Sequence, residues 1–153
     1  MNVTVERVSG GADIDAIVAL EEESFTNPWS RDTLVWELRN SDVTRIYVAK
    51  GDDGRVVAFC ACWVIFDELH VNTLAVSPPV RRQGIGSQLM RAVLEDAIAA
   101  GATRATLEVR ASNTAAIGVY TALGFRVRAT RRRYYTKPDE DAYILWLDEL
   151  QPS

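Results

Sequence analysis

Three polar side chains in the second half of the chain have types and spacings that can support chemistry on a bound ligand. Glu108 lies in a segment that alternates like a β-strand, on the face opposite the apolar residues, where its carboxylate can accept a proton. Asn113 and Tyr120 are seven residues apart in a segment with helical spacing, so they share a helix face. The same residues fit structural roles: a carboxylate paired with Arg110 or water, a capping asparagine and a core tyrosine.

A second candidate is the turn at 80–87, Val-Arg-Arg-Gln-Gly-Ile-Gly-Ser, between a predicted strand and a predicted helix. Its two glycines let the backbone turn tightly, so that free N–H groups and the positive helix end can point at one anion. A plain loop-to-helix junction with two solvated arginines fits equally well. The turn lacks the Gly-Lys-Ser/Thr of a Walker loop, and Leu89 stands where a dinucleotide fingerprint needs its third glycine. A pyrophosphate held without a metal fits what is present.

Hydrophobic periodicity predicts the elements that must position these residues. Strands are expected at Asn2–Val8, Arg45–Lys50, Arg55–Phe66, Val71–Val76, Thr103–Arg110, Phe125–Thr130 and Ala142–Leu147, and helices at Asp13–Phe25, Ser30–Asn40, Ile85–Ala100 and Asn113–Leu123. The order is βααβββαβαββ. The strand–helix–strand unit at 71–110 requires a parallel pair, whereas the early strands form antiparallel hairpins. The fold class is therefore α/β, with a mixed sheet of the α+β kind.

Local signals mark where these elements begin and end. Ser30 and Ser112 are expected to cap the helices that follow them. Gly101 and Gly124 are expected to stop two helices, and the loop at 51–54, with glycine at both ends, predicts a hairpin. Glu68 and His70 are expected to precede the central strand and are given no catalytic role.

Composition and charge narrow the classes of function. The 153 residues are 48% hydrophobic and 25% charged, which is typical of one globular domain covering 1–153. A net charge of −4 argues against a general nucleic-acid binder. The first 76 residues carry 6 basic and 13 acidic side chains and the remaining 77 carry 11 and 8, so an anion site is expected in the second half.

The apolar segments and cysteines indicate a cytoplasmic protein. The longest apolar run, Ala58–Phe66, is half the length needed to cross a membrane, and the N-terminus lacks a charged region followed by an apolar one. Cys60 and Cys62 share a strand face without the geometry to bridge each other, so both are expected to be reduced core thiols. With one histidine and no cysteine–histidine cluster, no metal site is expected.

Several short motifs connect nearly the whole chain to one enzyme superfamily. They are Leu74-Ala75-Val76 followed by Arg81-x-x-Gly84-x-Gly86, the run Leu-Glu-Val-Arg-Ala-Ser-Asn at 107–113, and Tyr120-x-x-Leu123-Gly124-Phe125. On these motifs the sequence resembles the GNAT superfamily of acetyl-CoA-dependent N-acetyltransferases. Two further elements, Phe25-x-x-Pro28-Trp29-Ser30 and Arg132-Arg133-Tyr134-Tyr135, make it most similar to the ribosomal-protein-alanine N-acetyltransferases within that superfamily.

The resemblance implies the GNAT fold and a role for each matched residue. Glu108 matches the proton acceptor, acting through water, and Tyr120 matches the proton donor to the coenzyme thiolate. The residues matched to acetyl-CoA binding are Leu74, Ala75 and Val76 along the pantetheine arm, Arg81, Arg82, Gln83, Gly84, Ile85, Gly86 and Ser87 around the pyrophosphate, and Asn113. The residues matched to the peptide entrance are Pro28 and Trp29, with Tyr134 and Tyr135 in a loop between the last two strands.

The implied reaction is transfer of an acetyl group from acetyl-CoA, without a metal, to a protein N-terminal α-amine. The best-matched acceptor is the N-terminal alanine of small-subunit ribosomal protein eighteen. An α-amine ordinarily has a pKa of about 8, against roughly 10.4 for lysine, so it needs less deprotonation. Lysine or small-molecule amines, and a non-catalytic acyl-CoA-binding module, are the alternatives. The sequence leaves open the oligomeric state and whether the arginines at 131–133 contact coenzyme, peptide or solvent.

Overall fold

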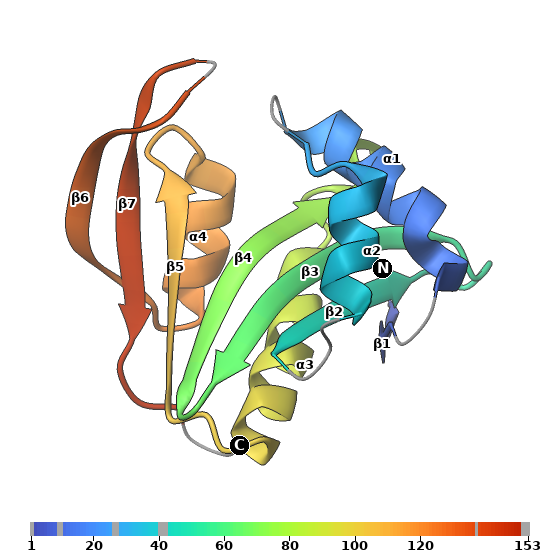
Figure 1. Ribbon diagram of the computed structural model, residues 1–153, viewed down its shortest axis with the longest axis horizontal. Coiled ribbons are helices and arrows are strands. Elements are labelled where there is room, and N and C mark those ends of the chain that lie inside the picture. Colours follow the sequence, from blue (N-terminus) through green and yellow to red (C-terminus); the bar gives the residue numbers. More distant parts are fainter. Residues whose placement is uncertain (1, 9–10, 26–27, 40–42, 137, 151–153) are drawn as a thin grey trace.

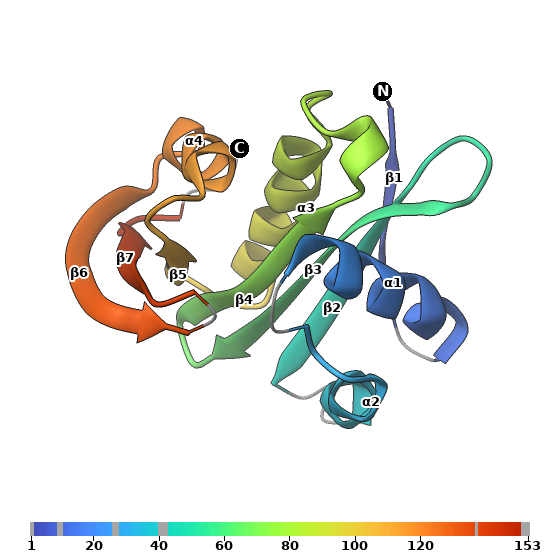
Figure 2. The same ribbon diagram turned by 90° about the horizontal axis from the view of Figure 1, so that it is seen from above.

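Within the residues that the structure describes, seven strands form one sheet in the order β1-β2-β3-β4-β5-β7-β6, with helices on both faces (Figures 1 and 2). The computed structural model describes residues 2–8, 11–25, 28–39, 43–136 and 138–150. The strands are β1 (Thr4–Arg7), β2 (Thr44–Lys50), β3 (Val56–Ile65), β4 (Glu68–Val76), β5 (Arg104–Arg110), β6 (Arg126–Tyr135) and β7 (Glu140–Leu147). The helices are α1 (Ile14–Ser24), α2 (Arg31–Arg39), α3 (Ile85–Ala99) and α4 (Thr114–Ala122), with short 3-10 turns at Gly11–Asp13 and Pro78–Val80.

The predicted order of strands and helices and the mixed-sheet class are confirmed. The pair β4·β5 is parallel, and the pairs β2·β3 and β3·β4 are antiparallel, as the crossover and hairpin arguments required. The predicted end of the second helix at Asn40, and Asn27 in the break before it, lie outside the described residues.

Each face of the sheet has its own hydrophobic cluster. α3 and α4 cover one face, where Leu89 and Tyr120 pack with Cys60. α1 and α2 cover the other face, where Ile17 and Leu34 belong to the buried cluster. The molecule therefore has three layers over the β1–β4 half of the sheet. No helix in the described ranges combines the length and apolar character needed to span a membrane.

Most of the local signals in the sequence are confirmed. The Oγ atom of Ser30 accepts a hydrogen bond from the N–H of Thr33 at 3.2 Å, which caps α2. Gly101 and Gly124 adopt positive φ angles of 100° and 104° directly after α3 and α4, the backbone conformation that glycine adopts without strain. Both cysteines are free and buried, as predicted.

The predicted cap of α4 is wrong by one residue. Asn113, rather than Ser112, precedes the first helical residue, and its Oδ1 accepts a hydrogen bond from the N–H of Ala116 at 3.2 Å. The hydroxyl of Ser112 instead bonds to Oε1 of Glu140 at 2.8 Å and so ties this turn to β7. Asparagine and serine cap helices about equally well, so the local sequence does not separate the two positions.

β4 and β6 extend furthest beyond their predicted bounds. β4 begins at Glu68 rather than Val71, so Glu68 and His70 lie within the central strand. β6 continues to Tyr135, so Tyr134 and Tyr135 are strand residues and not loop residues. β6 is an edge strand that pairs only with β7 and is exposed along nearly its whole length, which removes the alternating pattern that marks a half-buried strand.

Candidate active site

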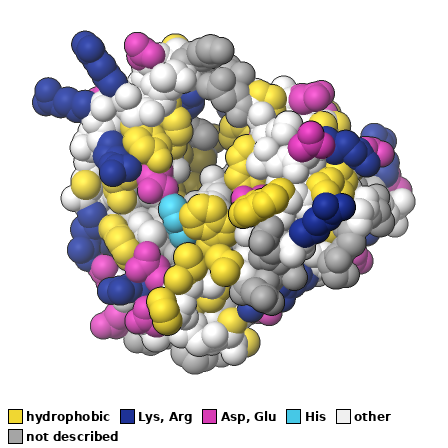
Figure 3. All heavy atoms as spheres, viewed as in Figure 1, with side chains coloured by type: hydrophobic (Ala, Val, Ile, Leu, Met, Phe, Trp, Pro, Cys, Tyr) yellow, Lys and Arg dark blue, Asp and Glu magenta, His cyan; other side chains and the backbone are white. Residues whose placement is uncertain are grey.

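β4 and β5 diverge partway along their length. They pair only between Glu68–Val71 and Arg104–Leu107. Val71 and Thr73 lie opposite consecutive residues of β3, which leaves Asn72 as the extra residue of a β-bulge. A bulge bends its strand, and beyond it the carboxyl ends of β4 and β5 separate (Figure 1), where the surface is hollowed in Figure 3. The first part of the site is thus an opening in the middle of the sheet.

The matched segment Leu74–Val76 forms one wall of this opening. On one edge it pairs with β3, and on the other edge no β5 residue pairs with it in the described structure. A strand edge in this state presents backbone N–H and C=O groups that can bond to an extended ligand. The segment is therefore available for the role that the resemblance gave it.

The Gly-rich turn lies at the end of the same strand. Gly84 is the N-cap of α3, with a left-handed φ of 78°, and has no side chain to accept bonds from the first helical turn. A Cβ atom on Gly86 would lie 3.7 Å from a methyl of Val76, so this first turn packs closely on the end of β4. The N–H groups of Ile85, Gly86 and Ser87 point out of the helix end, as in anion sites.

The arginines of this turn differ in their surroundings. The Nε atom of Arg81 donates to the carbonyl of Val76 at 2.9 Å, which fixes the turn to β4. Arg82 is exposed and has a positive φ of 65°, and Gln83 is exposed beside it. Both arginines are exposed, and Arg81 is the one that is tied to β4.

Glu108 lies on β5, on the face covered by α1 and α2, and contacts a residue that the sequence did not assign. Its Oε2 atom lies 2.7 Å from Nε2 of His70 on β4. That hydrogen bond is the largest cause that holds the pKa of Glu108 below its ordinary value. Burial acts in the opposite direction, and electrostatic interactions with His70 and Arg131 lower the pKa further. The carboxylate is therefore ionised at neutral pH.

The alternative pairing of Glu108 with Arg110 does not occur. The guanidinium of Arg110 instead donates to the carbonyls of Thr136 and Pro138 at 2.9 and 3.0 Å. It also lies over the ring of Tyr135, 4.5 Å from its centroid. Arg110 thus holds the β6–β7 end of the sheet in place.

Tyr120 lies on the opposite face, on α4. Its side chain is 4% exposed and packs edge-on against the ring of Phe125. Burial is the main cause that raises the pKa of Tyr120, with smaller contributions from Cys60 and Tyr135. The phenol keeps its proton at all physiological pH values, which suits a hydrogen donor. The base candidate and the acid candidate therefore lie on the two faces of the sheet that the opening connects.

The two segments matched to a peptide entrance have different contacts. Tyr135 is half-buried, and its pKa is raised to about 12 by burial, then by Tyr134 and Glu108. This places Tyr135 within electrostatic range of the carboxylate. Trp29 is half-buried and its backbone N–H donates to Oε2 of Glu21 at 3.0 Å, while Pro28 is exposed. Among the described residues, no hydrogen bond or ring contact joins the two segments.

The sequence did not single out Glu21, and it gave His70 no catalytic role. Glu21 on α1 is 2% exposed, its Oε1 has no hydrogen-bond partner in the described structure, and burial raises its pKa. Glu21 is the first of three consecutive glutamates at 21–23. Only its position one helical turn after Ile17 distinguishes the buried glutamate from the other two.

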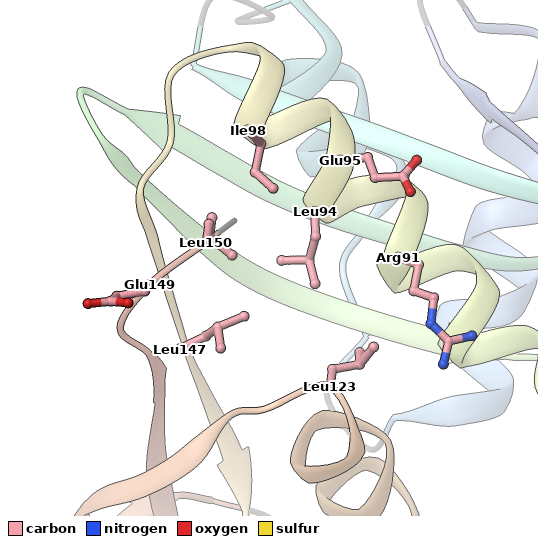
Figure 4. Close-up of a pocket in the computed structure, with 8 residues that line it drawn as sticks. All are labelled: Arg91, Leu94, Glu95, Ile98, Leu123, Leu147, Glu149 and Leu150. Atoms are coloured by element: carbon pink, nitrogen blue, oxygen red, sulfur yellow. The ribbon is translucent and has the colours of Figure 1, made fainter. Parts of the chain in front are cut away.

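Two hollows lie outside the opening. The pocket in Figure 4, about 340 Å³, is lined by Leu94, Ile98, Leu147 and Leu150, with Arg91 and Glu95 at its rim, and contains no predicted site residue. A second pocket of about 310 Å³ is lined by Trp63, Ile65, Phe66, Asp67, Glu68 and His70, together with Arg104. Because it shares His70 with the Glu108 contact, this second pocket adjoins the candidate site.

Asn113 permits a test that separates its two roles. Asn113→Ala should lower the free energy of unfolding by about 1 kcal/mol because the cap of α4 is lost, whereas Asn113→Ser should preserve stability. Chemical denaturation measures both. If Asn113 also binds coenzyme, the serine variant should still show a raised KM for acetyl-CoA. An unchanged KM in a stable serine variant would leave Asn113 with the capping role alone.

Comparison with known proteins connects this geometry to an enzyme family. A family model described as the acetyltransferase (GNAT) family matches residues 14–125. The ribosomal protein bS18-alanine N-acetyltransferase of Escherichia coli (strain K12) is 34% identical over 137 residues, covering 88% of this chain and 90% of that protein. A Bacillus subtilis (strain 168) protein provisionally named for the same activity is 35% identical over 135 residues, covering 88% and 89%. The crystal structure of the ribosomal-protein-S18-alanine N-acetyltransferase from Escherichia coli matches with a TM-score of 0.84 and 31% identity, covering 98% of this chain and 97% of that one.

Proposed function

The chain belongs to the acetyltransferase (GNAT) family, and from that membership we propose that it acetylates the N-terminal α-amine of a protein, using acetyl-CoA. The acceptor that we propose is the N-terminal alanine of ribosomal protein bS18, the substrate in the name of the Escherichia coli relative. The observation that carries the proposal is the placement of Glu108 and Tyr120 on the two faces of a sheet that is open between β4 and β5. An ionised carboxylate and a protonated phenol are the two groups that the reaction needs.

The residues around the opening fit acetyl-CoA. The first turn of α3 offers N–H groups, and Arg82 offers a positive charge, to the pyrophosphate. The free edge of Leu74–Val76 offers backbone hydrogen bonds to the amides of the pantetheine arm. Asn113 is the N-cap of α4, and α4 lies on the same side of the sheet as α3, the helix that follows this turn.

The reaction moves protons at two places. Glu108 takes, through a water, a proton from the bound ammonium, so that the amine nitrogen can bond to the carbonyl carbon of the thioester. Tyr120 gives its proton to the sulfur as the carbon–sulfur bond breaks, and it regains one from solvent. Glu108 then passes its proton to solvent, and the second proton of the attacking nitrogen also leaves to solvent. Because Tyr120 takes one proton back, each cycle yields one amide, one thiol and one free proton. Glu108 can accept a proton in this step because its lowered pKa leaves the carboxylate ionised before the amine binds.

The pocket beside His70 supports a peptide as acceptor. Trp63, Ile65 and Phe66 give it an apolar wall. Asp67 and Glu68 add two negative charges, and Arg104, which pairs with both, offsets one of them. Phe66 is 93% exposed, so this surface offers apolar area to a partner. A chain that continues from the acceptor amine past Glu108 can therefore lie against it, whereas a small amine would leave it unused.

The test is acetylation of matched peptides. With acetyl-CoA, a peptide copying the N-terminus of the host's own bS18 should gain one acetyl group at its α-amine, located by fragment masses, with release of one thiol. The same peptide with a blocked N-terminus should gain none, even where it contains lysine. Acetylation of the blocked peptide or of polyamines would favour the small-amine or lysine alternative, and tight acetyl-CoA binding without any acetylated acceptor would favour a binding module.

We also propose that residues 1–153 form one N-acetyltransferase domain. The domain would work in the cytoplasm, where ribosomal proteins and acetyl-CoA meet.

A further inference from the structure

His70, the sole histidine of the chain, is held in a defined position on β4. It pairs with Thr106 across the parallel ladder, which puts its side chain on the same face as Glu108, two residues further along β5. On the other side, Trp63 of β3 lies opposite His70, and the two rings meet edge-on with centroids 5.6 Å apart and planes at 87°. The imidazole is therefore fixed by strands on both sides.

The contact with Glu108 uses one oxygen of the carboxylate. Nε2 of His70 lies 2.7 Å from Oε2, and because an ionised carboxylate only accepts hydrogen bonds, the imidazole donates. This contact does not use Oε1. His70 lies two residues before the bulge at Asn72. It therefore contacts Glu108 at the point where β4 and β5 begin to separate.

We propose that His70 is a positioning residue for acetyl transfer, which orients the carboxylate of Glu108 through its imidazole N–H. The inference rests on the proposed role of Glu108 as proton acceptor. A role in stability alone fits poorly, because the side chains are 28% and 24% exposed and a partly exposed pair contributes little to folding. His70 itself lines the 310 Å³ pocket, where a substrate can reach it.

The surrounding charges determine the direction of the pH effect. Arg131 and Tyr135 lie within electrostatic range of Glu108, and Asp67, Glu68 and Arg104 line the pocket beside His70. The hydrogen bond from His70 is the largest cause of the lowered pKa of Glu108, and burial acts in the opposite direction. Loss of the donor therefore raises the pKa of Glu108. The acidic limb of kcat/KM, which follows ionisation of this carboxylate, should then move to higher pH.

The test uses two variants of His70 in two backgrounds. His70→Phe keeps a ring against Trp63 without a donor and should lower kcat about tenfold, with KM for acetyl-CoA unchanged and the acidic limb moved up. His70→Gln keeps an N–H donor and should recover most of the rate. In the Glu108→Gln background, His70→Phe should cost nothing further, because the two residues act as one unit. An equal loss in both backgrounds, or an unmoved acidic limb, would overturn the proposal.

A readout without any acceptor separates this proposal from the proposed function. Because His70 is the sole histidine, its imidazole signals in NMR spectra need no assignment. They should shift as Glu108 titrates, and that step should be missing in Glu108→Gln. If no peptide is acetylated but the step is present, the acceptor assignment fails and the His70–Glu108 contact stands. Identical His70 signals in both proteins would overturn the contact itself.

Discussion

Replacement of Tyr120 by phenylalanine should lower kcat for acetyl transfer by about 100-fold, because general-acid help of this kind contributes a factor of that order. The hydroxyl is the only group removed. The ring of Tyr120 packs edge-on with Phe125 inside the core of the α3 and α4 face, and phenylalanine preserves this packing. The KM for acetyl-CoA should therefore stay close to that of the wild type. Steady-state kinetics with a saturating peptide measures the two constants separately.

A second buried tyrosine provides a matched control for this variant. Tyr47 belongs to the same core cluster, and its hydroxyl donates to Asp96 near the far end of α3. Tyr47→Phe removes a partly buried tyrosine hydroxyl away from the opening, so it should change stability and leave kcat unchanged. Equal kcat values for Tyr120→Phe and the wild type would remove the proton-donor role. A matching loss in Tyr47→Phe would trace the effect to core packing.

Most features with local causes could be predicted from the sequence, although the predicted cap of α4 is one residue away from Asn113. The cap at Ser30 and the stops at Gly101 and Gly124 depend on a side-chain acceptor or a positive φ within one helical turn, and all three are present. The hairpin loop at 51–54 also has a local cause, because Gly54 adopts a positive φ of 80°. Such signals involve only residues adjacent in the chain, so no knowledge of packing is needed to interpret them.

Features that depend on strand register could not be predicted. The contact between His70 and Glu108 requires the alignment of β4 with β5, which a long crossover through α3 sets and which no turn length fixes. The bulge at Asn72 then changes which residues of β4 face each side. The prediction of a loop at Tyr134 and Tyr135 is wrong for a related reason, because an exposed edge strand has no hydrophobic alternation to mark it.

Replacement of Glu108 by glutamine should lower kcat/KM by about 100-fold near pH 6, with a smaller loss as the pH rises towards 9. In the wild type the carboxylate is ionised over this range, because its pKa lies below the ordinary value, and it can take the proton from a bound ammonium. Glutamine cannot accept that proton. The rate of the variant should then follow the fraction of amine that is already neutral. This fraction increases with pH and reaches one half at the pKa of the amine, about 8. Initial rates across the pH range, with one peptide, measure the difference.

Asp96 on α3 provides a control for the loss of a carboxylate in Glu108→Gln. It accepts a hydrogen bond from Arg45 at 3.0 Å and lies near the end of α3 opposite the Gly-rich turn, so Asp96→Asn removes one negative charge outside the site. This control should keep the pH dependence of the wild type, with at most a loss of stability. A loss in Glu108→Gln that is the same at pH 6 and pH 9 would show that the carboxylate binds or orients a substrate without accepting its proton. If the rates of Glu108→Gln and the wild type converge at high pH, the role of Glu108 is proton transfer. The need for a base is the one contribution that disappears once the amine is already neutral.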